Sequence, residues 1–403
     1  MTKKVNGGTI AIIVLLIVIV VGVLAILAAW LLPMLTNDEL SVEKRLEVLQ
    51  EARTVYRQYA NTYGSTEIEA DYYFYQKDEK CIVTIENGRP LNIYTSMEAA
   101  AEDTIGTSDL SVLFATNIDK LYAYRKAIEP MEPDSDDTLS ILMIGNSFSV
   151  DAIEYVPDMA LSAGVKNIHI GSMFIPGCSL SMHATNAKAN ASKYHFYVNT
   201  GDGWNMPAID YASTSGDTSL FEAITSHGWD YICIQQVSHL SGKSETYNDD
   251  LEYMIRYINM YAPNSKLIWH MTWAYQQDST HSEFPNYNSD QTTMYNAILS
   301  TVQEKIVADK RFSFVIPCGT AVQNARSSLL GDTITSDGYH MKQPFGRYLT
   351  AMMVVKALGV DIDDVTFLPL GMSAKQQKIA KESVNNAYDH PFEVTPSQYT
   401  EQP

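Results

Sequence analysis

Cysteine is scarce in this chain of 403 residues, and no cysteines or histidines have the spacing of a zinc site. The four cysteines are Cys81, Cys178, Cys233 and Cys318, and they are far apart in the sequence. Cys233 lies within an apolar strand-like segment and Cys318 ends another, as buried small residues do. We therefore expect buried thiols, and neither a disulfide framework nor a metal site.

Positive charge is also scarce, since 28 Lys and Arg residues against 47 Asp and Glu residues give a net charge of −19. Such a surface repels phosphate backbones and anionic headgroups, which argues against nucleic acid as a partner and against polybasic docking on lipid. It favours neutral or cationic ligands. With 46% apolar residues the composition is that of a globular protein, and the length suffices for two or three domains.

Charge is absent from one long stretch near the N-terminus. Residues 10–35 are uncharged and apolar, and a helix of that length spans a bilayer with some tilt. The run is long for a signal peptide and lacks a good cleavage site, so we expect an uncleaved signal anchor within residues 1–36. Lys3 and Lys4 precede the run, while Asp38 and Glu39 follow it. This asymmetry predicts a single-pass membrane protein with its N-terminus inside and its bulk extracellular.

Residues 37–133 have the pattern of a small α+β module. Apolar residues at helical spacing over 41–64 and a second helical segment over 96–103 accompany strand-like segments at 71–76, 80–85 and 90–94. The module has no conspicuous site. We prefer a stalk that holds the rest of the chain off the membrane to a module that contacts proteins or glycans.

Strand-like and helix-like segments alternate from residue 134 to residue 390. Strands are expected near 139–145, 168–170, 231–234, 266–269 and 312–316, and helices near 152–163, 251–261, 290–309 and 344–358. The alternation predicts an α/β domain with a mostly parallel sheet and helices on both faces. We expect an inserted β-hairpin over 194–207 beside a substrate cleft, and a flexible tail over 391–403.

Polar residues follow each predicted strand, and parallel strands bring their carboxyl ends to one edge of a sheet. These residues are Asn146, Ser147, Gly177, Cys178, Gln235, Gln236, Ser238 and His270, joined by Asp337 and His340 after the last strand. Gly145-Asn146-Ser147 alone is better explained as turn and helix-cap chemistry. The convergence of all these residues predicts an active site.

Ser147 has the partners that a catalytic serine needs. A serine hydroxyl is a weak nucleophile until a base takes its proton, and histidine suits that role near neutral pH. Asp337, three residues before His340 on one turn, would let a carboxylate orient the imidazole. Backbone N–H groups of Ser147 and Gly177 are candidates for the oxyanion hole. Asn146, next to the serine, is a candidate for substrate contact.

Two other histidines compete for the role of base. His281 follows Asp278 at the same spacing, but the pair lies in a long polar loop, so we expect His281 at the surface or on the substrate side. His270 ends the fourth strand, and its alternative role is a hydrogen-bonded histidine at the floor of the site. Trp273 and Tyr275 lie beside it and would suit stacking on a sugar ring.

Three motifs carry a resemblance to a known superfamily. Gly145-Asn146-Ser147-Phe148-Ser149, Ile175-Pro176-Gly177-Cys178-Ser179-Leu180 and Asp337-Gly338-Tyr339-His340, in this order, resemble those of the SGNH/GDSL hydrolases. Segments 269–275 and 319–326 are similar, more narrowly, to the bacterial DUF4886 family. The resemblance covers roughly residues 139–360.

The resemblance implies a flavodoxin-like three-layer α/β/α fold and ester hydrolysis without a metal or other cofactor. It implies that Ser147 is the nucleophile and the first oxyanion donor, and that Gly177 is the second donor. His340 would be the base, and Asp337 its partner.

The chain departs from the superfamily pattern at two places. Asn146 replaces the Asp of Gly-Asp-Ser, a mild change because this residue is not the nucleophile. The Gly-x-Asn-Asp block, which supplies a side-chain amide to the oxyanion hole, is absent. Gln235 and Gln236 take its place after the third strand, and the amide of either could do the same job.

These expectations predict a membrane-anchored extracellular serine esterase that acts on an acylated glycan or another small ester, with O-acetyl carbohydrate as the first choice. One alternative is acyl transfer to a sugar hydroxyl by the same acyl-enzyme. Another is a glycan-binding surface protein with little turnover, given the missing Asn.

Overall fold

The computed structural model describes residues 40–63, 70, 72–106, 108, 110, 113–115, 118–124, 131–133, 137–205 and 216–401. The predicted membrane anchor over 10–35 lies outside these residues. Within the described ranges, no helix combines the length and the apolar character that crossing a bilayer requires.

Residues 40–124 include a five-stranded antiparallel sheet with the strand order β3-β2-β1-β5-β4. The elements are α2 (Val42–Tyr63), β1 (Tyr72–Asp78), β2 (Cys81–Glu86), β3 (Arg89–Tyr94), α3 (Met97–Ile105), β4 (Leu113–Ala115) and β5 (Leu121–Tyr124). Side chains alternate along β1, so that Tyr73 and Tyr75 pack with α2 while Phe74 packs with α3. The two helices and three strands expected in this part are present.

A six-stranded sheet with the order β11-β10-β9-β6-β7-β8 follows. The strands are β6 (Thr138–Gly145), β7 (Asn167–Phe174), β8 (His195–Asn199), β9 (Tyr231–Ile234), β10 (Lys266–His270) and β11 (Val315–Ile316). Five strands are parallel, and β8 pairs antiparallel with β7 at one edge. Without β8, the chain order across the sheet is 2-1-3-4-5, the order of flavodoxin-like doubly wound sheets.

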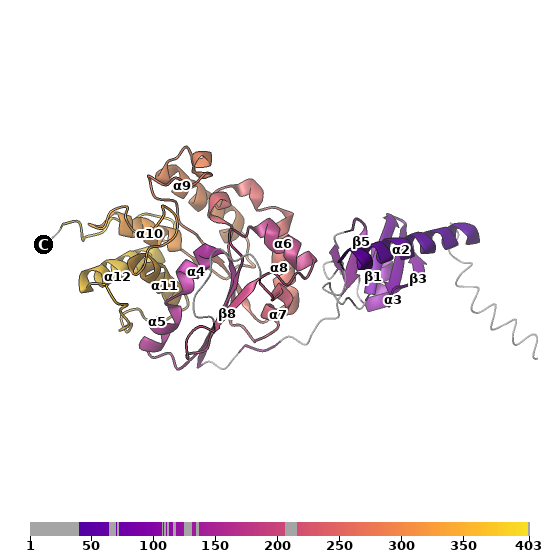
Figure 1. Cartoon of the computed structure of the whole chain (residues 1–403), viewed down its shortest axis with the longest axis horizontal. Helices are drawn as coiled ribbons and strands as arrows, with labels where there is room; N and C mark the ends of the chain where they lie inside the picture. Colours follow the sequence, from indigo (N-terminus) through magenta and orange to yellow (C-terminus); the bar gives the residue numbers. More distant parts are fainter. Residues whose placement is uncertain are drawn as a thin grey trace, which may run out of the picture.

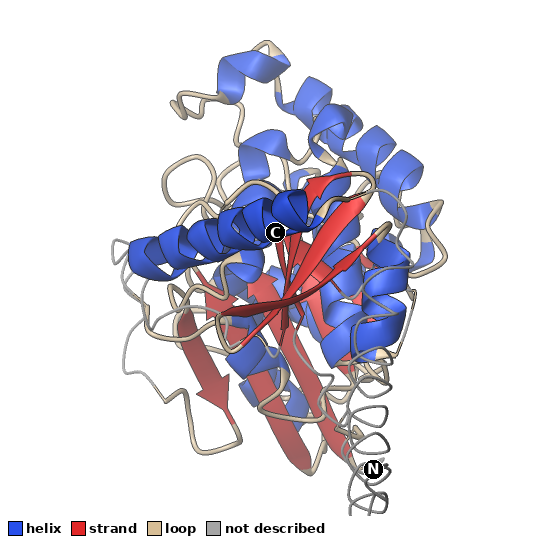
Figure 2. Cartoon of the chain, turned by 90° about the vertical axis from the view of Figure 1, so that its right-hand side faces the viewer, coloured by secondary structure: helices blue, strands red, loops and turns tan. Residues whose placement is uncertain are grey.

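Helices cover both faces of this sheet and make three layers (Figure 1). One layer holds α4 (Ser147–Ile153), α5 (Val156–Ser162), α10 (Cys318–Arg326), α11 (Phe345–Ala357) and α12 (Ala374–Asp389). The other holds α6 (Leu180–Lys188), α7 (Leu220–Ile224) and α8 (Asp249–Tyr261). Two further helical stretches are α9 (Gln291–Val302) and the π-helical turn Gln303–Val307, and three short 3₁₀ turns are Ser238–Leu240, Ser244–Thr246 and Phe284–Tyr287. Figure 2 shows the strands and helices by colour.

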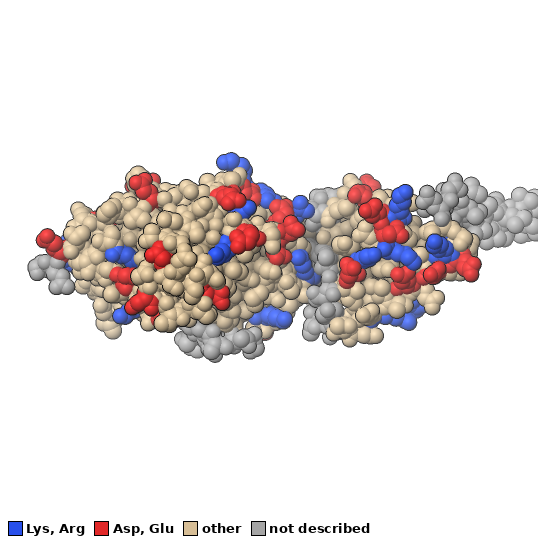
Figure 3. Space-filling view, turned by 90° about the horizontal axis from the view of Figure 1, so that it is seen from above, with Lys and Arg blue, Asp and Glu red and all other residues tan. Residues whose placement is uncertain are grey.

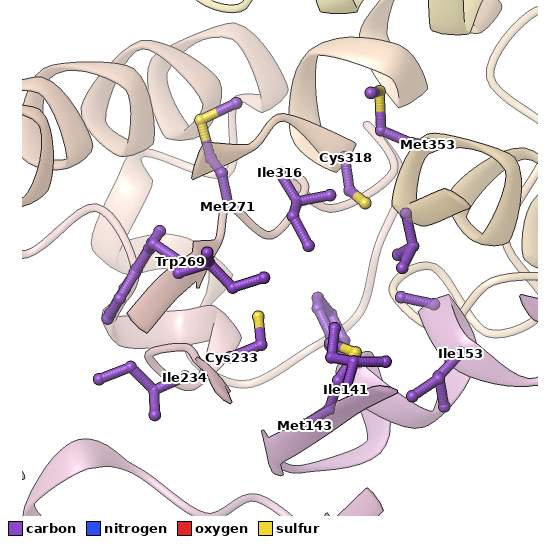
Figure 4. Packing of buried hydrophobic residues seen from close by; sticks show 14 of the residues in the cluster. Ile141, Met143, Ile153, Cys233, Ile234, Trp269, Met271, Ile316, Cys318 and Met353 are labelled. Atoms are coloured by element: carbon purple, nitrogen blue, oxygen red, sulfur yellow. The ribbon is translucent and has the colours of Figure 1, made fainter. Parts of the chain in front are cut away.

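The core fills both faces of the six-stranded sheet, against α4 and α11 on one face and against α6 and α8 on the other. Residues 140–145 of β6 are all buried, as expected of a parallel strand covered on both faces. Figure 4 shows Ile141 of β6, Cys233 of β9 and Met353 of α11 in this core. All four cysteines are buried and none forms a disulfide, as the sequence predicts.

Charged side chains are mixed over the surface. On the face drawn in Figure 3, the Lys and Arg side chains of the described residues are interspersed with Asp and Glu and form no continuous basic area. This distribution agrees with the low content of basic residues.

The fold differs from the expectation in three respects. Helices α6, α10 and α12 were not predicted, and α12 in particular is mostly polar with only one narrow buried face. The tail was predicted to be flexible, yet residues 391–401 pack on the domain: Thr395 N–H donates to Asn324 Oδ1 at 2.8 Å, and Leu329 N–H to the Tyr399 carbonyl at 2.7 Å. The last strand is shorter than predicted and comprises Val315–Ile316.

Candidate active site

Ser147 stands where β6 ends and α4 begins. Asn146 is the N-cap of α4, and its Oδ1 accepts a hydrogen bond from the Phe148 N–H at 3.0 Å. His340 Nε2 lies 2.8 Å from Ser147 Oγ, and His340 Nδ1 lies 2.7 Å from Asp337 Oδ2. The structure therefore brings together the three side chains that the sequence proposes as nucleophile, base and orienting carboxylate.

One turn carries both the carboxylate and the imidazole. Asp337 Oδ1 accepts hydrogen bonds from the Tyr339 and His340 N–H groups at 3.2 and 2.8 Å, and Gly338 supplies the positive φ of 92°. Partial burial raises the pKa of Asp337, but the hydrogen bonds from His340 outweigh it and hold that pKa below its usual value. Ionised Asp337 can only accept, so His340 Nδ1 carries the proton and its Nε2 lone pair faces Ser147.

Asp151, a residue that the sequence analysis missed, braces this turn. Its side chain is fully buried in α4, one helical turn after Ser147. Asp151 Oδ2 accepts from the Met341 N–H at 2.7 Å, and Oδ1 forms an ion pair with Arg347 Nη2 at 2.7 Å. Burial raises the pKa of Asp151 to about 6, although Arg347 opposes the shift. An isolated acidic residue in the apolar stretch 150–153 was the available signal.

The backbone N–H groups of Ser147 and Gly177 are the two predicted oxyanion donors. Gly177 is exposed in the loop between β7 and α6, with a φ of 62°. Neither N–H donates to another described residue. Asn146 Nδ2 donates to the Cys178 carbonyl at 3.0 Å, which ties this loop to the turn that carries Ser147.

The two glutamines do not take the place of the missing Asn. Gln235 is buried, and its Nε2 donates to Asn146 Oδ1 at 2.9 Å. Gln236 Nε2 donates to Thr246 Oγ1 at 3.0 Å, while its Oε1 accepts from the Leu180 N–H at 3.0 Å. Because both amides are used inside the protein, the expectation that one of them completes the oxyanion hole is not supported.

His270 braces the same network and does not act on Ser147. Its Nδ1 lies 2.8 Å from Gln235 Oε1, and it must be the donor because that oxygen can only accept. Its Nε2 is buried without a hydrogen-bond partner among the described residues. Burial lowers the pKa of His270 to about 3, so the ring is neutral. The chain His270–Gln235–Asn146 thus runs beneath the serine turn.

The predicted substrate contacts at Asn146, His270, Trp273 and Tyr275 are wrong, because all four side chains are buried. Trp273 stacks on Phe148, with ring centroids 4.4 Å apart, and donates to the Tyr339 carbonyl at 2.7 Å. These residues support the site from within and offer no face to a sugar.

In the rival pair Asp278–His281, the two side chains have separate hydrogen-bond partners. Asp278 Oδ1 accepts from Gln276 Nε2 at 2.7 Å, and His281 Nδ1 accepts from the Glu283 N–H at 3.2 Å. His281 is half-buried beside Tyr339, with ring centroids 4.8 Å apart. It therefore lies next to the turn that carries His340, as a substrate-side residue would.

A sequence model of the family described as "Domain of unknown function (DUF4886)" matches residues 140–389. The chain belongs to the DUF4886 family. A crystal structure of a DUF4886 family protein from Bacteroides uniformis is 34% identical, and the match covers 66% of this chain and 100% of that chain with a TM-score of 0.61. No curated protein sequence matches this DUF4886 chain.

Two more distant solved structures also match this DUF4886 chain. An acetylxylan esterase from Geobacillus stearothermophilus is 11% identical over 58% of this chain and 98% of that chain, with a TM-score of 0.35. The C-terminal catalytic domain of a peptidoglycan O-acetyltransferase from Streptococcus pneumoniae is 11% identical over 55% and 93%, with a TM-score of 0.30.

A second buried ion pair lies beneath the loop of His281 in this DUF4886 protein. Arg326 Nε and Asp332 Oδ1 are 2.7 Å apart, and the Arg326 side chain is 4% exposed. Asp332 Oδ2 accepts from the Gln277 N–H at 2.7 Å and from Gln291 Nε2 at 2.9 Å. This ion pair was not predicted, because no local pattern in the sequence indicates it.

Proposed function

We propose that this DUF4886 protein is a serine esterase that removes acyl groups, above all O-acetyl groups, from carbohydrates. The observation that supports the proposal is the continuous hydrogen-bonded chain from Ser147 Oγ through His340 to Asp337, with distances of 2.8 and 2.7 Å. These three side chains lie at the carboxyl edge of the sheet, where open α/β sheets bind their ligands. The resemblance to SGNH hydrolases gives the same residues the same roles.

The chemistry proceeds in two steps. Ser147 Oγ attacks the acyl carbonyl carbon while His340 Nε2 takes its proton, and the N–H groups of Ser147 and Gly177 stabilise the oxyanion. The intermediate expels the alcohol, which receives the proton from His340, and the acyl group stays on Ser147. A water molecule then attacks the acyl-enzyme with His340 again as base, and the carboxylic acid leaves. Asp337 stabilises the imidazolium in both steps.

We also propose that the enzyme is held at the cell membrane by residues 1–36, with the remainder of the chain outside. The uncharged run over 10–35, preceded by Lys3 and Lys4, supports this placement. The part of the chain over residues 40–124 would then act as a spacer between the bilayer and the active site. An acylated glycan of the cell surface is the substrate class that fits this placement.

The central test uses the full-length chain in detergent with p-nitrophenyl acetate as substrate. Ser147→Ala is expected to lower kcat by about a million-fold, because it removes the nucleophile. A fluorophosphonate probe is expected to label wild type at Ser147 and to leave Ser147→Ala unlabelled. The exposed Ser192 provides the matched control, and Ser192→Ala should hydrolyse and label as wild type does.

Full activity or full labelling of Ser147→Ala would refute the assignment. Transfer of the acyl group to an added sugar, with little free acid released, would replace hydrolysis by acyl transfer. Binding of polysaccharide with no turnover of any ester would instead indicate a glycan-binding protein.

A further inference from the structure

Three half-buried rings continue from the proposed base along the surface. We define the ring strip as Tyr339, His281 and His239. Ring centroids are 4.4 Å apart for His340 and Tyr339, 4.8 Å for Tyr339 and His281, and 6.1 Å for His281 and His239. The ring strip is therefore a continuous surface that begins beside His340.

The buried Tyr275 supports the ring strip from beneath. Its ring centroid is 4.7 Å from that of His281 and 5.7 Å from that of Tyr339. Its hydroxyl is hydrogen-bonded to Ser238 Oγ at 2.8 Å, and Ser238 directly precedes His239. Fixed packing of this kind holds the ring strip in one arrangement, which a binding surface requires.

The sheet order places His239 and His281 of the ring strip on the opposite side of β6 from Gly177, one of the proposed oxyanion donors. Gly177 follows β7, on one side of β6, whereas His239 follows β9 and His281 follows β10, on the other side. The ester oxygen that leaves must receive its proton from His340 Nε2, so the alcohol portion lies next to His340. The alcohol portion is thus the part of the substrate that meets the ring strip.

The chemistry of the ring strip selects the kind of alcohol. His281 Nδ1 accepts from the Glu283 N–H, so the neutral ring presents Nε2–H as a donor. Burial lowers the pKa of His239 and of His281, so both rings are uncharged near neutral pH. Carboxylates of Glu283 and Asp337 are close enough to act on His281 and would repel an anion. Flat rings with N–H and O–H groups suit the apolar faces and hydroxyls of a neutral sugar.

We propose that the ring strip is the subsite for the alcohol portion of the ester, and that this alcohol is an uncharged sugar. This inference rests on the proposed esterase function and adds which surface recognises the substrate. Tyr339 and His281 provide the contacts nearest to the scissile bond, and His239 provides a more distant one.

The test compares two acetate esters with the full-length chain in detergent: a mono-O-acetylated methyl glucoside and vinyl acetate, whose leaving group is too small to reach the ring strip. For His281→Ala we expect the ratio of kcat/KM for the glucoside ester over vinyl acetate to fall about tenfold. His281→Gln, which keeps an N–H at the end of the side chain, should restore part of the ratio. The exposed His390 provides the control, and His390→Ala should keep the wild-type ratio.

Equal losses on both esters in His281→Ala would mean that the residue only positions His340, and they would overturn the proposal. An unchanged ratio would overturn it as well. A third ester, a mono-O-acetylated methyl glucuronoside, carries a carboxylate on its sugar. A wild-type preference for this ester over the glucoside ester would overturn the uncharged class of sugar. Ser147→Ala tests the esterase function itself and should be inactive on both esters. A failure of the esterase proposal can therefore be told apart from a failure of the subsite proposal, which His281→Ala tests.

Discussion

Two turns of this protein share the spacing Asp-x-x-His but differ in the hydrogen-bond partners of the carboxylate and of the imidazole Nδ1. In the turn at 337–340, the carboxylate binds the imidazole Nδ1 at 2.7 Å. In the turn at 278–281, the carboxylate accepts from Gln276, and the imidazole Nδ1 accepts from a backbone N–H at 3.2 Å. The first arrangement puts the proton on Nδ1 and leaves Nε2 as a base, whereas the second puts the proton on Nε2.

The partner of Nδ1, and not the spacing in the sequence, decides what each histidine can do. His340 can take a proton from Ser147. His281 beside it can only donate from the corresponding nitrogen while it is neutral, which suits recognition of a hydroxyl. Two histidines whose ring centroids are each within 4.8 Å of that of Tyr339 can thus serve one reaction in different roles.

Among the variants that distinguish the two turns, the largest effect is expected when the two carboxylates are changed in the same way. Asp337→Asn should lower kcat for p-nitrophenyl acetate by about 10,000-fold, because an amide no longer fixes the tautomer of His340. Asp278→Asn should leave kcat near the wild-type value, since Asp278 contacts neither histidine through a hydrogen bond. Equal losses in the two variants would contradict the distinction between the turns.

An intermediate effect is expected for the ion pairs beneath the two loops. Arg347→Ala leaves the fully buried Asp151 without its cation and should lower the free energy of unfolding by about 3–5 kcal/mol. Arg326→Ala should cost less, because the Asp332 side chain is 28% exposed and keeps two hydrogen-bond donors. Urea denaturation of both variants measures the difference, and a larger loss in Arg326→Ala would reverse the ranking.

The smallest effect concerns pH. The pKa of Asp337 is lower in the folded protein than its ordinary value, so its ionisation stabilises the fold above about pH 4, and this contribution is lost as the pH falls through the lowered pKa. Asp337→Asn should therefore flatten the decline of Tm in acid. If variant and wild type lose Tm in parallel, the hydrogen bonds from His340 do not hold that carboxylate ionised.

Much of the fold could be predicted because local patterns determine it. Alternating strand and helix segments led to the doubly wound sheet, and the buried run of β6 followed from its apolar residues. Helix α12 could not be predicted in this way, because most of its residues are polar and contacts with α10 and α11 hold it in place. The tail at 391–401 is ordered by hydrogen bonds to residues about 70 positions away, which no local pattern reveals.

The site could be predicted only as far as the identity of its polar residues. Ser147, Asp337 and His340 belong to short motifs, and the structure brings them together. How deeply a residue at the carboxyl edge is buried depends on the loops that pack over it, here residues 238–247 and 276–289. No local pattern in the sequence encodes that packing. Gln235 and His270 were therefore expected to meet the substrate, although both are buried. For His270 the structure supports the alternative role, a hydrogen-bonded histidine at the floor of the site.

The burial of all four thiols has a practical consequence for labelling. A fold without disulfides needs no oxidising compartment, so the chain can be produced under reducing conditions. Burial also raises the pKa of Cys178 to about 12 and keeps the native sulfurs slow toward alkylating reagents. In Ser147→Cys, the new sulfur beside His340 would then react with iodoacetamide ahead of the others. The amount of label incorporated would therefore report the number of folded active sites.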